Sequence, residues 1–375
     1  MDSIIYKTAP AGDYINKGVL TMALSIIQSE TKKKKPESKE IPFGRTFTDH
    51  MFVMDYEADK GWHEPRIVPY EPLTLDPAAM IFHYGQTVFE GMKAYRTDDD
   101  RVLLFRPEKN FERLNLSSER LSIPAIDEDE VLGYLKELVE LEKDWVPSFE
   151  GTSLYIRPFI ISTEANLAVA PSKSYKLMII LSPVGPYFSG GLKPVTINVE
   201  NEFTRAVKGG TGMAKTAGNY SSGYQAQAKA VEEGNNDVLW LDGVEKRYIE
   251  EVGSMNIFFK VDGEVVTPAL SGSILKGITR ASILELLEKW GIPVTERRIA
   301  IEELYEWYEQ GKVEEAFGTG TAAVISPVGE LNWLGKKMVI NDHEIGELSQ
   351  KLYDTITGIQ RGRKEDTEGW TVTID

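Results

Sequence analysis

A lysine beside a cluster of glycines is the first feature of this sequence that could do chemistry. Lys215 lies in KGGTGMAKTAGNYSSGY, residues 208–224, after glycines at positions 209, 210 and 212 and five residues before Tyr220. Glycine permits positive φ angles and lets a ligand approach the backbone closely. A lysine in such a segment can be a solvated residue of a surface turn, a phosphate ligand or an amine that reacts with a carbonyl group.

The phosphate-ligand interpretation would make this segment a nucleotide-binding P-loop. Gly209, four further residues and then Ala214-Lys215-Thr216 approach the pattern G-x-x-x-x-G-K-[ST]. The apolar run Val238–Leu241 before an aspartate could even supply a magnesium-binding strand. However, Ala214 stands where the loop needs glycine, and the preceding apolar run ends at Val199 instead of leading into the loop. The match to a P-loop is therefore weak.

The carbonyl-reactive interpretation requires more than a lysine, because a free lysine amine is mostly protonated and unreactive. A phosphorylated aldehyde such as pyridoxal phosphate also needs a cation and N–H groups for its phosphate and a carboxylate for its ring nitrogen. Glu250-Glu251 could supply the carboxylate, although a glutamate pair at a strand edge usually lies on the surface. Thr279 begins a predicted helix whose N–H groups could bind the phosphate, although it could equally be an ordinary cap.

Composition excludes several other kinds of chemistry. The chain has no cysteine, which removes disulfides, thiolate nucleophiles and thiolate metal sites, and its net charge of −16 argues against a nucleic-acid partner. We expect no metal, because the four histidines, His50, His63, His83 and His343, lack the spacing of zinc ligands. Residues 1–30 do not resemble a signal peptide and no apolar run approaches about 20 residues, so we expect a cytoplasmic protein without a membrane span.

The 375 residues exceed the usual size of a single hydrophobic core and predict two α/β domains. We leave residues 1–40 unassigned as an N-terminal extension and charged linker, and expect a small α/β domain over 41–183. The proline- and glycine-rich stretch 184–194 is the expected connection, and 195–375 the larger C-terminal domain. Periodicity predicts strands at 175–181, 195–199, 238–241 and 255–261, and helices after a capping box at 127–130, around 283–290 and over 345–359.

Taken together, these motifs resemble the branched-chain amino acid aminotransferases of the fold-type IV, or class IV, pyridoxal-phosphate family, and most of all their Firmicute bacterial members. The resemblance covers residues 41–361. It implies a two-domain α/β (α+β) fold with the active site in the cleft between an N-terminal α/β domain and a C-terminal pseudo-barrel α/β domain. The motifs that carry it occur in one order: GRTFTDHMFVMDY, HYGQTVFEGMKAY, GTSLYIRPFIISTE, KTAGNY, IEEVGSMNIFF, GSILKGITR and EAFGTGTAAVISPVGE.

The resemblance implies a role for each residue that would bind pyridoxal 5′-phosphate. Lys215 matches the catalytic Schiff-base lysine, which also moves the proton, and Glu251 matches the carboxylate that pairs with the ring nitrogen. Tyr220 matches the tyrosine that hydrogen-bonds the phenolic oxygen. The other implied cofactor contacts are a phosphate-binding arginine, a phosphate cup and a residue packed on the ring: Arg113; Ile278, Thr279 and Thr321; and Leu275.

The resemblance also implies a substrate pocket. Tyr84, with the backbone of Thr321 and Ala322, would hold the α-carboxylate, and Arg157 would meet the distal carboxylate of glutamate. Core packing or a structural ion pair would explain these side chains if the resemblance were absent. The remaining implied pocket residues are an apolar wall, a serine in place of a common threonine, and a pair contributed across a dimer interface: Phe89, Tyr155 and Tyr220; Ser254; and Leu167 and Val169.

The implied reaction is a reversible ping-pong transfer of the amino group of L-leucine, L-isoleucine or L-valine to 2-oxoglutarate in a homodimer. Its products are branched 2-oxo acids and L-glutamate, so it can serve synthesis or breakdown of branched-chain amino acids. A D-amino acid aminotransferase or an aminodeoxychorismate lyase of the same fold stays an alternative, because each would keep the lysine and the carboxylate. A P-loop nucleotide-binding protein is the alternative from another class. Ala323 and Ser326 replace a redox-sensitive C-x-x-C of some animal members, so we expect no thiol regulation.

Overall fold

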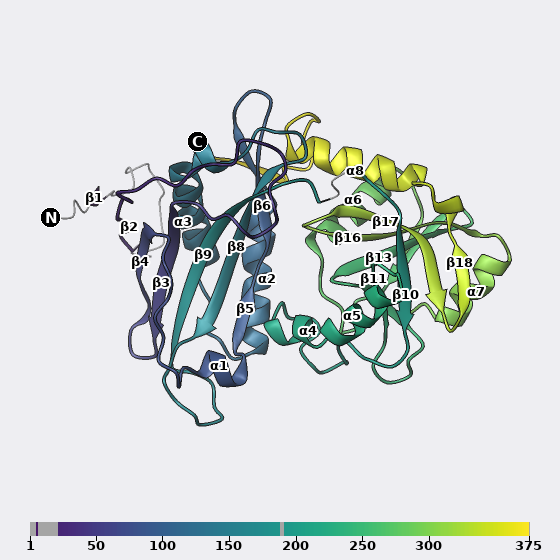
Figure 1. Ribbon diagram of the computed structural model, residues 1–375, viewed down its shortest axis with the longest axis horizontal. Helices are drawn as coiled ribbons and strands as arrows, with labels where there is room; N and C mark the ends of the chain where they lie inside the picture. The colour runs from purple at the N-terminus through teal and green to yellow at the C-terminus, as the bar shows by residue number, and fades with distance from the viewer. Residues whose placement is uncertain (1–4, 7–21, 188–190, 375) are drawn as a thin grey trace. The chain divides into compact units, whose positions relative to one another are not determined.

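The computed structural model describes residues 5–6, 22–187 and 191–374, so part of the N-terminal extension lies outside these ranges. The chain divides into two compact units: unit 1 comprises residues 1–186 and 360–375, and unit 2 comprises residues 187–359 (Figure 1). Residues 360–375 therefore lie outside unit 2, whereas we expected the C-terminal domain to extend to residue 375. They belong to unit 1 because β19, Thr371–Ile374, pairs antiparallel with β7, Val102–Phe105.

Unit 1 is built on one mostly antiparallel sheet. Its described strands number ten, in the order β1-β2-β4-β3-β9-β8-β6-β7-β19, with β5 paired to β8. The long strand β8 faces both β5 and β6, so Phe89 lies opposite Phe159 and Lys93 opposite Tyr155. The other strands are β1 Ile5–Tyr6, β2 Ser25–Ile26, β3 His50–Glu57, β4 Gly61–Pro69, β5 Thr87–Phe89, β6 Met92–Arg96, β8 Ser153–Ser162 and β9 Ser174–Val184.

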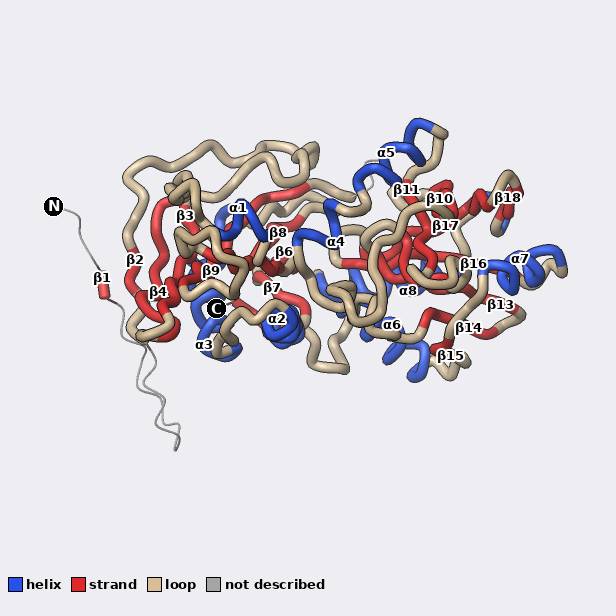
Figure 2. Tube along the Cα trace, turned by 90° about the horizontal axis from the view of Figure 1, so that it is seen from below, coloured by secondary structure: helices blue, strands red, loops and turns tan. Residues whose placement is uncertain are grey.

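Two helices of unit 1, α2 and α3, cover one face of this sheet, as Figure 2 shows. α3, Glu128–Leu141, begins after Asp127, whose side chain accepts a hydrogen bond from the Glu130 backbone N–H at 2.9 Å. The predicted N-cap is confirmed, but Glu130 does not complete the capping box, because its carboxylate binds Met22 N and Tyr134 Oη. The other helices of unit 1 are α1 Met80–Tyr84, α2 Pro107–Arg120 and the 3-10 turn Lys143–Trp145.

Unit 2 contains the pseudo-barrel that the resemblance implies. β12 pairs with β11 on one side and with β13 on the other, so β10, β11, β12, β13, β16 and β17 form a closed ring. The ring strands and their neighbours are β10 Val195–Glu200, β11 Asp237–Leu241, β12 Ile249–Val252, β13 Met255–Val261, β14 Glu264–Pro268, β15 Val294–Arg297, β16 Val313–Gly320, β17 Val324–Trp333 and β18 Lys336–Val339. The predicted strands at 195–199, 238–241 and 255–261 are confirmed by β10, β11 and β13, as 175–181 is by β9.

The helices of unit 2 pack on the outside of the ring and connect its strands. Buried apolar residues from the strands, Ile197, Leu239, Ile257 and Phe259 among them, form the core. The helices are α4 Ala217–Ser221, α5 Tyr224–Glu232, α6 Ile278–Lys289, α7 Ile301–Glu309, the 3-10 turn Asn341–His343 and α8 Glu347–Gln360, and α6 and α8 match the helices predicted there. In the described part of the chain, none of the helices is long and apolar enough to cross a membrane.

Candidate active site

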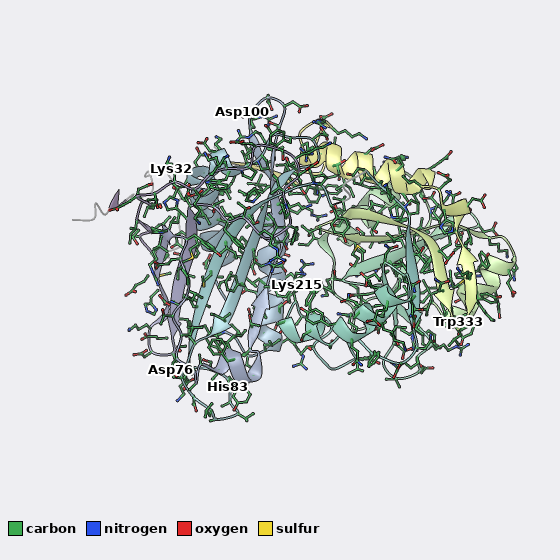
Figure 3. All side chains as sticks on the ribbon, viewed as in Figure 1. Lys32, Asp76, His83, Asp100, Lys215 and Trp333 are labelled. Carbon is green, nitrogen blue, oxygen red and sulfur yellow. The ribbon has the colours of Figure 1, made fainter. Side chains whose placement is uncertain are left out.

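Lys215 stands two residues before α4, in the backbone turn that precedes this short helix (Figure 3). Its Nζ donates a hydrogen bond to Tyr220 Oη at 2.7 Å and lies 5.1 Å from the centre of the same ring. Because Tyr220 belongs to α4, one turn of helix brings the phenol back to the amine. The structure thus brings together two residues predicted for the site, through a contact between them that the sequence analysis did not predict.

Side-chain hydrogen bonds and two glycines determine the backbone conformation of the loop before Lys215. Asn219 Nδ2 donates to the carbonyls of Thr211 at 2.8 Å and Ala214 at 2.7 Å, which fixes the backbone next to Lys215. Gly209 has φ of +82°, and a Cβ on Gly212 would collide with the backbone of Ser273. Gly209 therefore permits a positive φ angle, and Gly212 permits the close approach of Ser273. Asn219, inside the KTAGNY motif, was not predicted as a site residue.

The geometry does not support a P-loop. A P-loop joins a strand directly to a helix that cradles phosphates. Here β10 ends at Glu200, well before the glycines, and α4 after Lys215 is only five residues long. Lys215 also has Tyr220 as its partner.

Glu251 lies inside β12, and its residue is only 3% exposed. The surface interpretation of the Glu250-Glu251 pair is wrong, because both residues are buried in the β11-β12-β13 region of the ring. Glu251 Oε1 accepts a hydrogen bond from the Leu275 backbone N–H at 2.7 Å and lies 3.3 Å from Arg205 Nη2. The carboxylate is therefore held by neighbours from two other segments of unit 2.

A cavity of about 250 Å³ in unit 2 joins several of these residues. It reaches four predicted site residues, Tyr220, Glu251, Ser254 and Leu275. Lys215 does not line it, although Ala214 and the ring of Tyr220 do. The other lining residues were not predicted from the sequence: Arg205, Gly212, Asn219, Gly223, Tyr224, Gln227, Trp240 and Gly253.

The predicted phosphate cup lies at the start of α6 and at the end of β16. α6 begins at Ile278, its N-cap is Gly277 and no side chain caps it, so Thr279 is a buried residue of the first turn and not the cap. Asn256 Nδ2 donates to the Leu275 carbonyl at 3.0 Å, and Asn256 pairs with Thr319 of β16. Asn256 thus ties the segment before α6 to the strand that leads into Thr321 and Ala322.

In unit 1, the predicted phosphate ligand Arg113 already has a carboxylate partner. Arg113 Nε and Nη2 donate to the two oxygens of Glu90 at 2.7 and 2.8 Å, and both side chains are buried. Asn110 Nδ2 also donates to Glu90, at 2.8 Å. Glu90 was not predicted, although it stands in the motif HYGQTVFEG. The two hydrogen bonds to Glu90 fix the orientation of the Arg113 guanidinium.

The predicted side-chain pocket of unit 1 is an aromatic cluster around one arginine. The Arg157 guanidinium lies 4.7 Å from the centre of the Phe89 ring and 5.2 Å from that of Tyr155, and its Nη2 donates to Tyr155 Oη at 2.9 Å. Arg157 Nε is buried without a partner. Phe43 packs edge-on against Tyr155 with ring centres 4.9 Å apart, a contact that the sequence did not indicate.

Tyr84 and the segment around Leu167 lie together in unit 1. Tyr84 Oη donates to the carbonyl of Leu167. Leu167 and Val169 are 64% and 88% exposed, so core packing does not explain these two side chains.

The histidines do not gather into a metal site. His83 lies on α1, and its Nε2 is 3.0 Å from the carbonyl of Pro77 (Figure 3). His50, the first residue of β3, is buried, and its Nδ1 contacts the carboxylate of Glu142. Across residues 5–6, 22–187 and 191–374, no group of three or more His, Cys, Asp or Glu side chains could hold a metal ion.

The sequence profile described as "Amino-transferase class IV" matches residues 87–331, which is more than half of the chain. The chain therefore belongs to the class IV aminotransferase family. It is 65% identical over 346 residues to a protein of Bacillus subtilis (strain 168) named "Branched-chain-amino-acid aminotransferase 2", covering 92% of this chain and 95% of that one.

Two solved structures resemble the fold. The branched-chain amino acid aminotransferase of Escherichia coli has a TM-score of 0.72 and 25% identity, over 87% of this chain and 99% of that chain. The branched-chain aminotransferase of the thermophilic archaeon Thermoproteus uzoniensis, solved with norvaline, has a TM-score of 0.72 and 26% identity, over 87% and 100%. The fold-type IV prediction is confirmed.

Proposed function

We propose that this protein is a branched-chain L-amino acid aminotransferase that uses pyridoxal 5′-phosphate. It transfers the amino group of L-leucine, L-isoleucine or L-valine to 2-oxoglutarate, reversibly. The observation that carries the proposal is the hydrogen bond from Lys215 to Tyr220, because Tyr220 and Glu251 line the same cavity. The 65% identity to a Bacillus subtilis relative of that name supports the choice of substrates.

The residues around the cavity fit a phosphorylated pyridine aldehyde. Glu251 supplies an anion for a protonated ring nitrogen, Leu275 supplies an apolar surface, and Tyr220 supplies a hydroxyl for the phenolic oxygen. Arg205 lines the cavity, and its buried Nε has no partner, as expected where a ligand or water would bring an acceptor. When bound, the cofactor would join Lys215 through its aldehyde and accept electrons from the substrate Cα through its ring.

Lys215 is the catalytic residue of the proposal. Its amine would take the proton from the substrate Cα and later give a proton back. Tyr220 Oη, 2.7 Å from the amine, orients Nζ for this role. The same hydroxyl would hold the phenolic oxygen of the cofactor.

We propose phosphate contacts from the backbone at Ile278 and Thr279, from Thr321 and from Arg113. The start of α6 offers backbone N–H groups that no side chain caps, and helix N-termini attract phosphate. The guanidinium of Arg113 is held in place by Glu90. A buried arginine with a fixed partner presents its other N–H groups in one direction.

Substrate selection in the proposal depends on unit 1 and on Ser254. Phe89 and Tyr155, whose rings flank Arg157, would offer an apolar surface to a branched side chain, and Arg157 would meet the distal carboxylate of glutamate or 2-oxoglutarate. Tyr84, Thr321 and Ala322 hold the α-carboxylate. A homodimer in which Leu167 and Val169 complete the partner's pocket stays a prediction, as does a cytoplasmic location.

An absorption spectrum of the purified protein tests the proposed function. We expect visible absorbance from the bound cofactor, a change on adding L-leucine and a return on adding 2-oxoglutarate. Consumption of D-alanine with no turnover of L-leucine would instead identify a D-amino acid aminotransferase. A colourless protein that binds ATP with magnesium would contradict the proposal altogether.

A further inference from the structure

Glu251 and Arg205 form a buried ion pair beside the cavity of unit 2. Arg205 Nη2 is 3.3 Å from Glu251 Oε1, and the two side chains are only 7% and 4% exposed. The same oxygen accepts the hydrogen bond from the Leu275 N–H. Arg205 Nη2 also donates to the carbonyl of Ser273, which anchors the guanidinium. One oxygen of Glu251 is thus held from two directions by groups that come from separate segments of unit 2.

The positive charge of Arg205 acts on two neighbouring carboxylates, those of Glu251 and Glu250. Glu250 is buried beside Glu251; its Oε1 accepts a hydrogen bond from Ser273 Oγ, and its Oε2 has no partner. Burial raises the pKa of Glu250, the hydrogen bond from Ser273 and the charge of Arg205 oppose the rise, and the charges of Glu251 and Asp242 add to it.

A guanidinium stays charged inside a protein, so Arg205 remains a cation throughout the physiological range. Arg205 therefore serves as the counter-ion of Glu251, while burial raises the pKa of Glu250. The phenols of Tyr220 and Tyr224 line the same cavity, and Lys215 Nζ donates to Tyr220 Oη. Asp242 is a further charge that acts on Glu250.

We propose that Arg205 is a positioning residue that keeps Glu251 ionised and correctly oriented before the cofactor binds. The proposal rests on the proposed function, in which Glu251 pairs with a protonated ring nitrogen. Burial without a counter-ion favours the protonated form of a carboxylate, and in that form it cannot pair as an anion with an N–H⁺ group. Arg205 does not itself touch the reacting atoms in this account; it acts through Glu251.

The full-length protein, stripped of cofactor, tests the first half of the proposal through its melting temperature between pH 5 and pH 8. In Arg205→Met the buried Glu251 carboxylate loses its cation, so its pKa in the folded state rises above that in the unfolded state. A group with a raised folded pKa loses its contribution to stability as pH rises through that pKa. We expect a small deficit at pH 5 and a deficit of about 5–10 °C at pH 8.

Two further variants separate this effect from a general loss of packing. The double variant Arg205→Met with Glu251→Gln removes both charges, so we expect it to melt above the single variant at pH 8 and to show no such pH dependence. Arg280→Met is the matched control, because Arg280 is also buried, donates to the Pro268 carbonyl and pairs with Glu296. Since Glu296 is half-exposed, the Arg280→Met deficit should not depend on pH.

Cofactor binding tests the second half. We expect the dissociation constant of pyridoxal phosphate, measured from the absorbance change on titration, to rise at least about tenfold in Arg205→Met and less in Arg205→Lys, which keeps the charge. A melting-temperature deficit in Arg205→Met that does not depend on pH, or normal pyridoxal phosphate binding by that variant, would overturn the role proposed for Arg205. Neither result would overturn the proposed function. Failure of the wild-type protein to bind pyridoxal phosphate would overturn the proposed function instead.

Discussion

Three arginines, Arg113, Arg157 and Arg205, have different partners, and the differences indicate what each can bind. Arg113 and Arg205 pair with the carboxylates of Glu90 and Glu251. The described partners of Arg157 are instead the hydroxyl of Tyr155 and two aromatic faces, which hold the guanidinium without neutralising it. An uncompensated cation in an aromatic pocket suits a substrate carboxylate that must bind in one half-reaction and leave in the other.

Replacing Arg157 should therefore separate the two substrates. In Arg157→Met we expect the KM for 2-oxoglutarate to rise at least about tenfold, because the distal carboxylate loses its cation, while the KM for L-leucine changes less than about threefold. Arg157→Lys should retain part of the 2-oxoglutarate affinity. Steady-state kinetics with each substrate varied would measure both values, and an equal rise for both substrates would contradict the assigned role.

Among the elements, α3 illustrates how much a local sequence signal determines. Its start is fixed by the Asp127 side chain, and its buried face consists of Val131, Leu135 and Leu138 at helical spacing. Neither feature depends on residues far along the chain. Tyr220 and Lys215 are likewise close in sequence, five residues apart, so their contact is set locally at the start of α4.

The N-cap of α3 gives a prediction about stability alone. Asp127→Ala should lower the free energy of unfolding by about 1 kcal/mol, because the Glu130 N–H loses its acceptor. Urea denaturation would measure the change. Asp129→Ala, in the exposed first turn of the same helix, is the control and should have a smaller effect; equal losses in both variants would contradict a specific capping role.

The turn between β11 and β12 gives a prediction about pH. Partial burial opposes ionisation of Asp242, but hydrogen bonds from the backbone N–H groups of Glu245, Tyr248, Arg247 and Val244 lower its pKa to about 2. A depressed folded pKa contributes stability above the unfolded pKa, about 3.9, and the contribution is lost as pH falls toward 2. The stability deficit of Asp242→Asn should therefore be full at pH 7 and shrink between pH 4 and pH 2.

Urea midpoints at several pH values would test this, with Asp262→Asn as a control at another turn. A deficit of Asp242→Asn that stays constant from pH 7 to pH 3 would show that the backbone hydrogen bonds do not depend on the charge.

For the whole molecule, the sequence predicted what is local and missed what is assembled from distant segments. Periodicity located the strands, but not the pairing of β12 with both β11 and β13 that closes the ring of unit 2. Nor did it show that β19 returns to unit 1, since a short strand carries no signal of its partner. The ion pair of Arg205 with Glu251 was hidden for the same reason, because it joins the segment after β10 to β12, and these strands are brought near each other by pairing with β11.

The most direct test of the account is to locate the covalent attachment of the cofactor. Reduction of the protein with borohydride, proteolysis and mass spectrometry should place a pyridoxyl group on the peptide that contains Lys215. The same treatment of Lys215→Ala should leave that peptide unmodified. A pyridoxyl group on another lysine, or none on the wild-type protein, would contradict the central claim that the amine of Lys215 holds the cofactor.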